Sequence, residues 1–427
     1  MERLRDVRLG EEMWTWRSPA GLRVVVVPKP GYQKTFAACS VRYGSIDQSF
    51  FPPGYAEPVH LPAGIAHFLE HKMFAQEYGD VFERFASLGA SANAFTSHTT
   101  TTYLFSTVEN FPPAMELLLD FVQHPYFTDE NVAREQEIIE QEILMYLDDP
   151  GWRGYQNLLE AMYRVHPLRV DIAGTVDSIR EITPEKLHLC HRTFYQPANM
   201  VVSVVGQVDP EEVFALCRSN PDEGPAAAGP PRREYPTEPA GVEAREVSRR
   251  MAVSRPFLRL GFKDVQTLGE SGEALLRRQI IASALLELVF GRSSPLYEDL
   301  YRDKLIDDTF SAQYEGESDF GFSMVGGRTG DPERLLARIR RELRAVGKRG
   351  VGREDWRRLQ KKGLGEYLAV FNSPEAISHL LTSYAFQGIS LFAYQRVLAG
   401  IEAEELEGRL RGHLNEETLA ASTILPR

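Results

Sequence analysis

One order of predicted elements occurs twice along the chain, and this repetition limits the fold more than any other feature. The first half has strand candidates at 22–27 and 36–43, a helical stretch at 63–74, strand candidates at 90–97 and 101–107, and helical stretches at 112–123 and 129–147. The second half has a strand candidate at 257–262, an apolar helix at 271–290, strand candidates at 309–314 and 320–325, and helical stretches at 331–346 and 353–370. The shared order of strand, helix, two strands and two helices predicts an α+β fold. We expect two homologous domains in tandem, each a mainly antiparallel sheet with helices packed on one face.

A linker is predicted between the two halves. Residues 219–240 are rich in Pro, Gly and Ala and lack apolar periodicity. We therefore expect an N-terminal domain at 1–218 and a C-terminal homologous domain at 241–427, which agrees with a length of 427 residues.

Composition excludes several classes of function. A formal net charge of -12 argues against nucleic-acid binding, which requires a basic surface. Cys39, Cys190 and Cys217 are odd in number and far apart, so a disulfide framework is not expected and a reducing compartment is favoured. The N-terminus lacks the apolar core of a signal peptide, and no stretch is apolar for the roughly 18 residues that a membrane span requires. These features predict a cytoplasmic protein that does not enter a membrane.

A metal-binding pattern lies in the first predicted helix. His67, Phe68, Leu69, Glu70 and His71 form an H-x-x-E-H sequence, the inverse of the commoner zinc-protease order. On a helix, positions i, i+3 and i+4 share one face, so the three polar side chains converge. Two imidazoles one turn apart can bind one Zn²⁺, and the Glu between them can reach water at that metal. The alternative is a surface helix whose histidines have no role.

A catalytic zinc needs a third protein ligand, and residues 132–147 are the best place to find it. Glu135 and Glu142 are seven residues apart, which is two turns along one helical face. Ile138 and Ile139 are predicted to lie between them on the same side. Two carboxylates in an apolar stripe are costly to bury unless a metal and its ligands compensate them. The alternatives are a salt bridge to a buried Arg, or a frayed helix that leaves both carboxylates in water.

Three sequence blocks carry a family resemblance. They are GIAHFLEHKMF, LGASANAFTSHTTTTYLF and REQEIIEQEI. Together they resemble the insulinase/pitrilysin (inverzincin) family of zinc metallopeptidases, in its bacterial half-length, YmfH-type branch. The resemblance extends from about residue 22 to the C-terminus. It implies two homologous α+β domains, one Zn²⁺ per chain, and two chains or chain halves that close a chamber around a peptide.

The resemblance also implies a role for each polar residue of these blocks. His67 and His71 would be zinc ligands, and Glu142 would be the third ligand. Glu70 would be the general base that takes the water proton as the scissile carbonyl is attacked. Glu135 would orient a ligand histidine.

A substrate-binding edge is implied on the strand after the zinc helix. Asn93, Ala94 and Phe95 resemble the corresponding segment of the family. An extended peptide would add to that edge through main-chain hydrogen bonds, which tolerate many sequences. The alternative for Asn93 is an ordinary turn residue.

The second half departs from the family pattern in the block LYEDLYRDKLIDDTFSAQY. Family members carry an Arg there, and a Tyr seven residues later, which reach the substrate near the zinc. Arg302 fits the Arg position, but Thr309 and Phe310 stand where the Tyr is expected. We therefore expect a heterodimer with a homologous subunit that supplies an Arg/Tyr pair. The alternatives are a homodimer in which Tyr301 or Tyr314 substitutes, or a weakly active monomer.

The sequence thus predicts a zinc-dependent endopeptidase that cleaves peptides or small unfolded protein segments. A maturation protease for one dedicated partner is a narrower form of the same prediction. A non-catalytic scaffold or assembly subunit of a peptidase-like heterodimer is the alternative from another class. The complete set of His67, Glu70, His71 and Glu142 favours the enzyme, because a degenerate subunit has no physical need to keep it.

Overall fold

The computed structural model describes residues 1–219, 231–265 and 269–427. Contacts along the chain divide it into two compact units. Unit 1 comprises Met1–Ile143, Val170–Tyr235 and Leu368–Phe386, and unit 2 comprises Leu144–Arg169, Pro236–Tyr367 and Gln387–Arg427. The predicted division into 1–218, 219–240 and 241–427 follows the halves of the sequence, whereas each compact unit also contains a segment of the other half.

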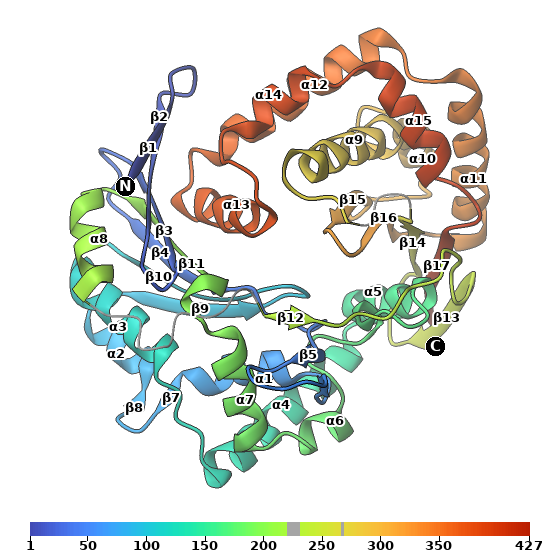
Figure 1. Ribbon diagram of the computed structural model, residues 1–427. Helices are drawn as coiled ribbons and strands as arrows, with labels where there is room; N and C mark the ends of the chain where they lie inside the picture. Colours follow the sequence, from blue (N-terminus) through green and yellow to red (C-terminus); the bar gives the residue numbers. More distant parts are fainter. Residues whose placement is uncertain (220–230, 266–268) are drawn as a thin grey trace. The chain divides into compact units, whose positions relative to one another are not determined.

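Unit 1 is built on a seven-stranded sheet with the order β1-β2-β3-β11-β4-β10-β9 (Figure 1). Its strands are β1 (Glu2–Asp6), β2 (Glu11–Arg17), β3 (Arg23–Pro28), β4 (Thr35–Val41), β9 (Ser91–Thr96), β10 (Thr101–Thr107) and β11 (Met200–Gly206). Strands β3 and β11 pair in parallel, and the other neighbours pair antiparallel. Two small sheets consist of β5 (Ser49–Phe51), β6 (Val59–His60) and β12 (Arg232–Arg233), and of β7 (Ala75–Gln76) and β8 (Gly79–Asp80). The order of the large sheet places β9 at its edge.

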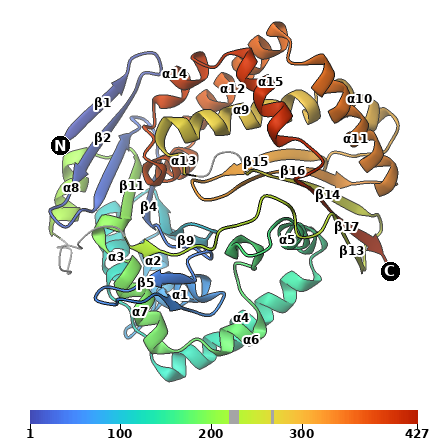
Figure 2. The same cartoon turned by 45° about the vertical axis from the view of Figure 1, so that its right-hand side comes forward.

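Helices pack on both faces of this sheet. The helices are α1 (Ile65–Met73), α2 (Val81–Ser87), α3 (Phe111–Gln123), α4 (Asp129–Asp148), α6 (Val176–Arg180), α7 (Pro184–Phe194), α8 (Pro210–Ser219) and α13 (Pro374–Gln387). On one face, Cys39 and Tyr103 of the strands join Phe121 of α3 in a continuous apolar core with α1 and α2. Helix α13 lies on the other face (Figure 2). There, the hydroxyl groups of Ser203 and Ser378 are 2.6 Å apart.

Unit 2 contains a five-stranded sheet with the order β13-β17-β14-β16-β15. Its strands are β13 (Glu246–Met251), β14 (Phe257–Lys263), β15 (Ser311–Gly316), β16 (Gly321–Arg328) and β17 (Leu419–Pro426). Its helices are α5 (Pro150–Met162), α9 (Gly272–Phe290), α10 (Pro295–Arg302), α11 (Pro332–Arg349), α12 (Arg353–Val370), α14 (Ala393–Ala399) and α15 (Ala403–His413). Helix α5 packs on β14 and β17, and a Cβ atom at Gly261 would lie 2.3 Å from the sulfur of Met162. Any larger residue at 261 would therefore require the Met162 side chain to move.

The two sheets share one topology. The order β3-β11-β4-β10-β9 in unit 1 corresponds to β13-β17-β14-β16-β15 in unit 2. The parallel pair of β3 with β11 corresponds to the parallel pair of β13 with β17. The predicted duplicated α+β fold is therefore confirmed, with one parallel pair in each sheet. The prediction that helices cover only one face is wrong for the unit 1 sheet, because α13 packs on its second face.

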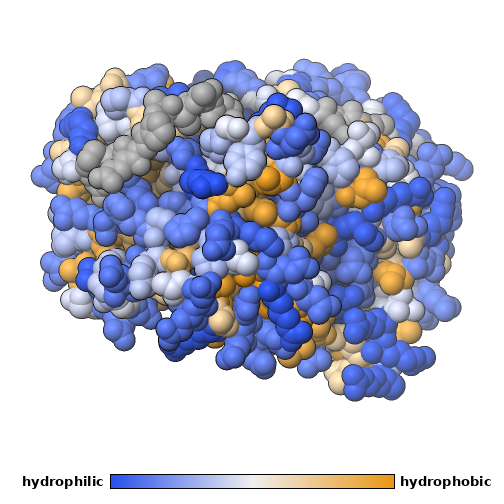
Figure 3. All heavy atoms as spheres, turned by 60° about the horizontal axis from the view of Figure 1, so that its bottom comes forward, coloured by the Kyte–Doolittle hydropathy of each residue, from blue (hydrophilic) through white to orange (hydrophobic). Residues whose placement is uncertain are grey.

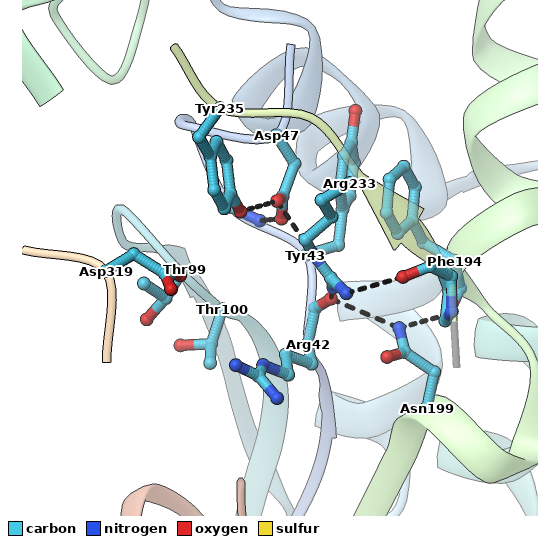
Figure 4. A network of polar contacts seen from close by, with 12 residues as sticks. Arg42, Tyr43, Asp47, Thr99, Thr100, Phe194, Asn199, Arg233, Tyr235 and Asp319 are labelled. Carbon is cyan, nitrogen blue, oxygen red and sulfur yellow. Dashed lines mark hydrogen bonds and ion pairs between the residues drawn. The ribbon is translucent and has the colours of Figure 1, made fainter. Parts of the chain in front are cut away.

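Part of the predicted linker is fixed to each unit. Residues 220–230 of the segment 219–240 lie outside the described residues. Further on, the buried carboxylate of Asp47 accepts hydrogen bonds from Arg233 Nε at 2.8 Å and from the Tyr235 hydroxyl at 2.5 Å (Figure 4). In unit 2, Lys263 Nζ lies 2.5 Å from Glu238, whose carboxylate also accepts three backbone N–H groups at 164–166. Buried charge pairs thus fix Arg233 of the predicted linker to unit 1 and Glu238 to unit 2.

No helix in the described ranges combines the length and apolar composition needed to cross a membrane. The surface in Figure 3 is mostly hydrophilic, with apolar residues in separate patches. Scattered apolar residues of this kind are normal on a protein surface.

Candidate metal centre and substrate edge

The H-x-x-E-H sequence lies on α1, as predicted. Gly64 precedes this helix with φ of 87°, and a Cβ atom there would lie 2.4 Å from the carbonyl oxygen of Ala173. Glycine therefore lets the chain enter α1 against this neighbouring backbone. Within α1, His67 is 9% exposed and Glu70 is 8% exposed. These two side chains are thus largely removed from water before any metal is considered, whereas His71 is half-buried.

Helix α4 brings two carboxylates to α1. Glu135 and Glu142 are half-buried, and Ile139 and Ile143 beside them are buried in the core of unit 1. The prediction for Ile138 is wrong, because this side chain is 47% exposed. The apolar stripe is therefore narrower than expected, and it still directs both carboxylates inward.

Three ligand atoms converge with the spacing that a tetrahedral metal requires. Glu142 Oε1 lies 3.7 Å from His67 Nε2, and the other oxygen, Oε2, lies 3.5 Å from His71 Nε2. Tetrahedral Zn²⁺ with bonds of about 2.0–2.2 Å holds its ligand atoms about 3.4 Å apart. These contacts are too long for good hydrogen bonds and fit a shared metal ion. Among the described residues, this is the one group of three His, Cys, Asp or Glu side chains with ligand atoms all within 4.8 Å of one another.

Glu135 supports the centre from behind His71. Its carboxylate lies 3.1 Å from His71 Nδ1, so an N–H at Nδ1 leaves the lone pair of Nε2 directed at Glu142. The ammonium of Lys72, a side chain that is 1% exposed, lies 3.7 Å from the second oxygen of Glu135. Burial opposes ionisation of Glu135, but the bond to His71 and the nearby Lys72 lower its pKa overall.

The two histidines differ in their environment. Burial, with a smaller contribution from His71, lowers the pKa of His67 to about 3, so its imidazole is neutral and can donate a lone pair. Burial is the largest single effect on His71 and acts against its protonation. The hydrogen bond to Glu135 and the nearby carboxylates of Glu70 and Glu142 together outweigh it, so the pKa of His71 is raised.

Glu70 stands on the same face of α1 and accepts a hydrogen bond from the edge strand β9. The hydroxyl of Thr96, on β9, donates a hydrogen bond of 2.7 Å to Glu70 Oε2. Burial raises the pKa of Glu70 even though this bond favours the carboxylate. Sequence reasoning missed both Thr96 and Lys72. Alternation along β9 could have indicated Thr96, since Ala92, Ala94 and Thr96 share one face of the strand.

The predicted substrate edge is the outer strand of the unit 1 sheet. Residues 91–96 pair with β10 on one side only. The Ala94 N–H donates to the side-chain oxygen of Asn93 at 2.9 Å, so this N–H points away from β10. Phe95 is 37% exposed on the face opposite to Ala94. The edge can therefore offer backbone groups to an added strand.

The predicted Arg302 and its neighbours lie in unit 2. Arg302 is 71% exposed at its side chain and pairs with Asp299 at 2.6 Å. The Thr309 hydroxyl bonds locally to Asp307 and to the Arg328 N–H, and Phe310 is 4% exposed. The Tyr314 hydroxyl donates to the buried carboxylate of Asp264 at 2.6 Å.

Comparisons with known proteins identify the family of this fold. Residues 56–176 match the family description Insulinase (Peptidase family M16), and residues 181–362 match Peptidase M16 inactive domain. The chain is 42% identical over 421 residues to the uncharacterized zinc protease YmfH of Bacillus subtilis (strain 168), covering 98% of each protein.

Solved structures of M16 and related proteases have the same fold as this chain. A structure from Alicyclobacillus acidocaldarius, described as M16-like, has a TM-score of 0.93 and 37% identity, covering 98% of this chain and 99% of that one. A protease from Helicobacter pylori has the same fold, with a TM-score of 0.83 and 20% identity, covering 97% of this chain and 100% of that one. The resemblance predicted from the sequence is therefore confirmed, and the chain belongs to the M16 (insulinase) family of peptidases.

Proposed function

We propose that this protein is a zinc-dependent endopeptidase that hydrolyses peptides or small unfolded protein segments. The observation that carries the proposal is the convergence of His67, His71 and Glu142 at the spacing of tetrahedral ligands, with Glu70 beside them. The similarity to a protein described as a zinc protease supports the choice of metal and reaction.

The chain's own residues fit zinc. Two imidazole nitrogens and one carboxylate are a ligand set common in catalytic zinc sites, which keep a position open for water or substrate. Zinc, when bound, supplies Lewis acidity that polarises a carbonyl and makes water a stronger acid. Glu135 fixes the ring of His71 through Nδ1, and Lys72 balances the charge of Glu135.

Glu70 moves the proton in this proposal. Its carboxylate takes a proton from water as the scissile carbonyl is attacked, and then gives it to the departing amine. Positioned proton transfer of this kind contributes about 10²–10⁴ in rate. The Thr96 hydroxyl fixes Glu70 Oε2 and leaves the other oxygen available for the proton.

The substrate is an extended peptide that adds to β9. Its main chain would replace the Asn93 side chain at the Ala94 N–H. Because such pairing uses backbone atoms, it accepts many sequences. The Asn93 side chain would then adopt two conformations. Without substrate it accepts the Ala94 N–H, and with substrate bound it turns away from this N–H.

A homologous subunit completes the site in this proposal. Thr309 and Phe310 carry no phenol, and the Tyr314 hydroxyl is committed to Asp264. Tyr301 remains as the exposed phenol of this segment, at 56%. Loss of one oxyanion donor costs about 10²–10³ in rate. We therefore infer a heterodimer whose second chain supplies an Arg/Tyr pair and helps to close a chamber around the peptide.

Cleavage of a mixed peptide library, followed by mass spectrometry, tests the proposal. We expect cleavage that requires zinc and stops with a chelator, with Glu70→Gln as the zinc-loaded inactive control. The isolated chain should be nearly inactive and should recover when the homologous partner is added. Cleavage that persists in Glu70→Gln, or no cleavage with zinc and partner, would contradict the enzyme. Full activity of the isolated chain would contradict the heterodimer alone.

A further inference from the structure

Helix α13 comes from the C-terminal half of the sequence but is a fixed part of unit 1. Just before its start, the carbonyl of Phe371 accepts a hydrogen bond from Lys29 Nζ at 2.9 Å. Near its end, the carbonyl of Ala385 accepts one from Arg23 at 2.8 Å, where a cation also favours the helix C-terminus. With the buried pair of Ser203 and Ser378 in the middle, these bonds hold α13 along the sheet.

This position places one exposed side chain beside the substrate edge. The ring centroid of His379 lies 5.5 Å from that of Phe95, at an interplanar angle of 53°. On its inner side, the same imidazole meets the buried ring of Phe36 edge-on at 5.8 Å. His379 itself is exposed. Phe36 thus supports the imidazole from below, and Phe95 and His379 together present two rings to solvent.

The two rings lie on the face of β9 that is opposite to the zinc helix. Ala94 packs against the core on the α1 side, and Thr96 reaches Glu70 on that side. Because successive strand residues point to opposite faces, Phe95 points to the α13 side. Phe95 directly precedes Thr96, and Thr96 is the strand residue that contacts Glu70, the proposed general base. Phe95 is therefore one residue away from the strand position next to the base.

We propose that His379 is a specificity-determining residue that forms, with Phe95, a subsite for one aromatic side chain of the substrate. The inference rests on the proposed function, because it assumes that a peptide adds to β9. Every second side chain of such a peptide points to the α13 side, and the one nearest the scissile bond lies against Phe95. His379 then covers this side chain from the edge of α13.

Ring geometry makes an aromatic side chain the preferred occupant. Tilted and edge-to-face ring pairs are favourable at centroid separations of about 4.5–7 Å. The two existing ring contacts already use this range. A third ring gains contact with both exposed rings, whereas an alanine side chain reaches neither. We expect a preference of about three- to tenfold for Phe over Ala at this position.

Peptide binding to the zinc-loaded, full-length Glu70→Gln protein tests the subsite without cleavage. Fluorescence anisotropy would measure the Kd of labelled Ala/Ser-rich peptides in which one Phe is moved along the sequence. We expect one position where Phe binds about three- to tenfold more tightly than Ala. His379→Ala in the same background should reduce that preference to near one, and His379→Phe should retain it. The matched control is Ser383→Ala, which changes an exposed residue one turn later on α13 and should change nothing.

Zinc content should be the same in all these variants, because His379 lies on the face of β9 opposite to the zinc helix. The melting temperature should change little, because His379 is exposed and meets the core only through the edge of the Phe36 ring. An unchanged preference in His379→Ala, an equal loss in Ser383→Ala, or no measurable peptide binding would overturn the proposal. Failure of the proposed function is seen separately, as absence of zinc-dependent cleavage in the protein that keeps Glu70.

Discussion

Replacing Glu135 by Gln should weaken zinc binding and folding for two different reasons. The amide cannot act as a charged acceptor for His71 Nδ1, and loss of such an outer partner typically costs about 10–100-fold in metal affinity. The same change leaves the buried ammonium of Lys72 without its carboxylate 3.7 Å away. Removing one partner of a buried ion pair costs about 3–5 kcal/mol of unfolding free energy.

The double variant Glu135→Gln/Lys72→Met separates these effects. It should recover most of the unfolding free energy, measured by urea titration of the metal-free protein, because no buried charge is left uncompensated. It should not recover zinc affinity, measured by competition with a chromophoric chelator. Glu137→Gln, an exposed change on α4, is the control and should affect neither quantity. Normal zinc affinity in Glu135→Gln would refute the orienting role. Recovery of affinity in the double variant would reduce Glu135 to a counter-ion of Lys72.

Three further predictions concern metal, chemistry and pH. Glu142→Gln should lose most of its zinc in elemental analysis, because an amide oxygen is a weaker ligand than a carboxylate; full occupancy would assign the third ligand elsewhere. Glu70→Gln should keep its zinc and lose at least about a hundredfold in turnover, and near-normal turnover would remove it as the base. Burial lowers the pKa of His191 to about 4 from an ordinary 6.5, so the unfolded chain takes up the proton first. The contribution of His191 to the unfolding free energy is therefore fully present above pH 6.5 and is lost as the pH falls toward 4. At pH 5 the loss is about 2 kcal/mol. Urea unfolding of the metal-free protein should show that loss reduced in His191→Gln, and an equal loss would contradict this account.

Local periodicity predicted the elements that carry the candidate ligands. The stretches 63–74 and 129–147 correspond to α1 (Ile65–Met73) and α4 (Asp129–Asp148). The seven-residue spacing of Glu135 and Glu142 predicted that both face one way, because this depends only on helix geometry. Residue spacing alone could not show where the apolar face of α4 ends. Ile138 was therefore wrongly predicted to lie on that face.

Contacts between distant segments could not be predicted in this way. Thr96 reaches Glu70 across 26 positions of the sequence, and its role depends on which strand lies beside α1. His379 meets Phe95 only because α13 packs on the sheet of the other half. No local pattern in residues 374–387 indicates that partner, since an amphipathic helix can cover any apolar face.

Helix α13 belongs to unit 1 but is encoded in the second half of the sequence, and this has a consequence for synthesis on the ribosome. The seven strands of the unit 1 sheet are all made by Gly206, but the last segment of unit 1 ends only at Phe386. At about 5–20 residues per second, the α13 side of the sheet stays open for roughly 10–40 s. Phe36 on that side then faces solvent or a chaperone. The three candidate ligands, His67, His71 and Glu142, are synthesised before α13. The metal can therefore bind the nascent chain before α13 packs on the sheet.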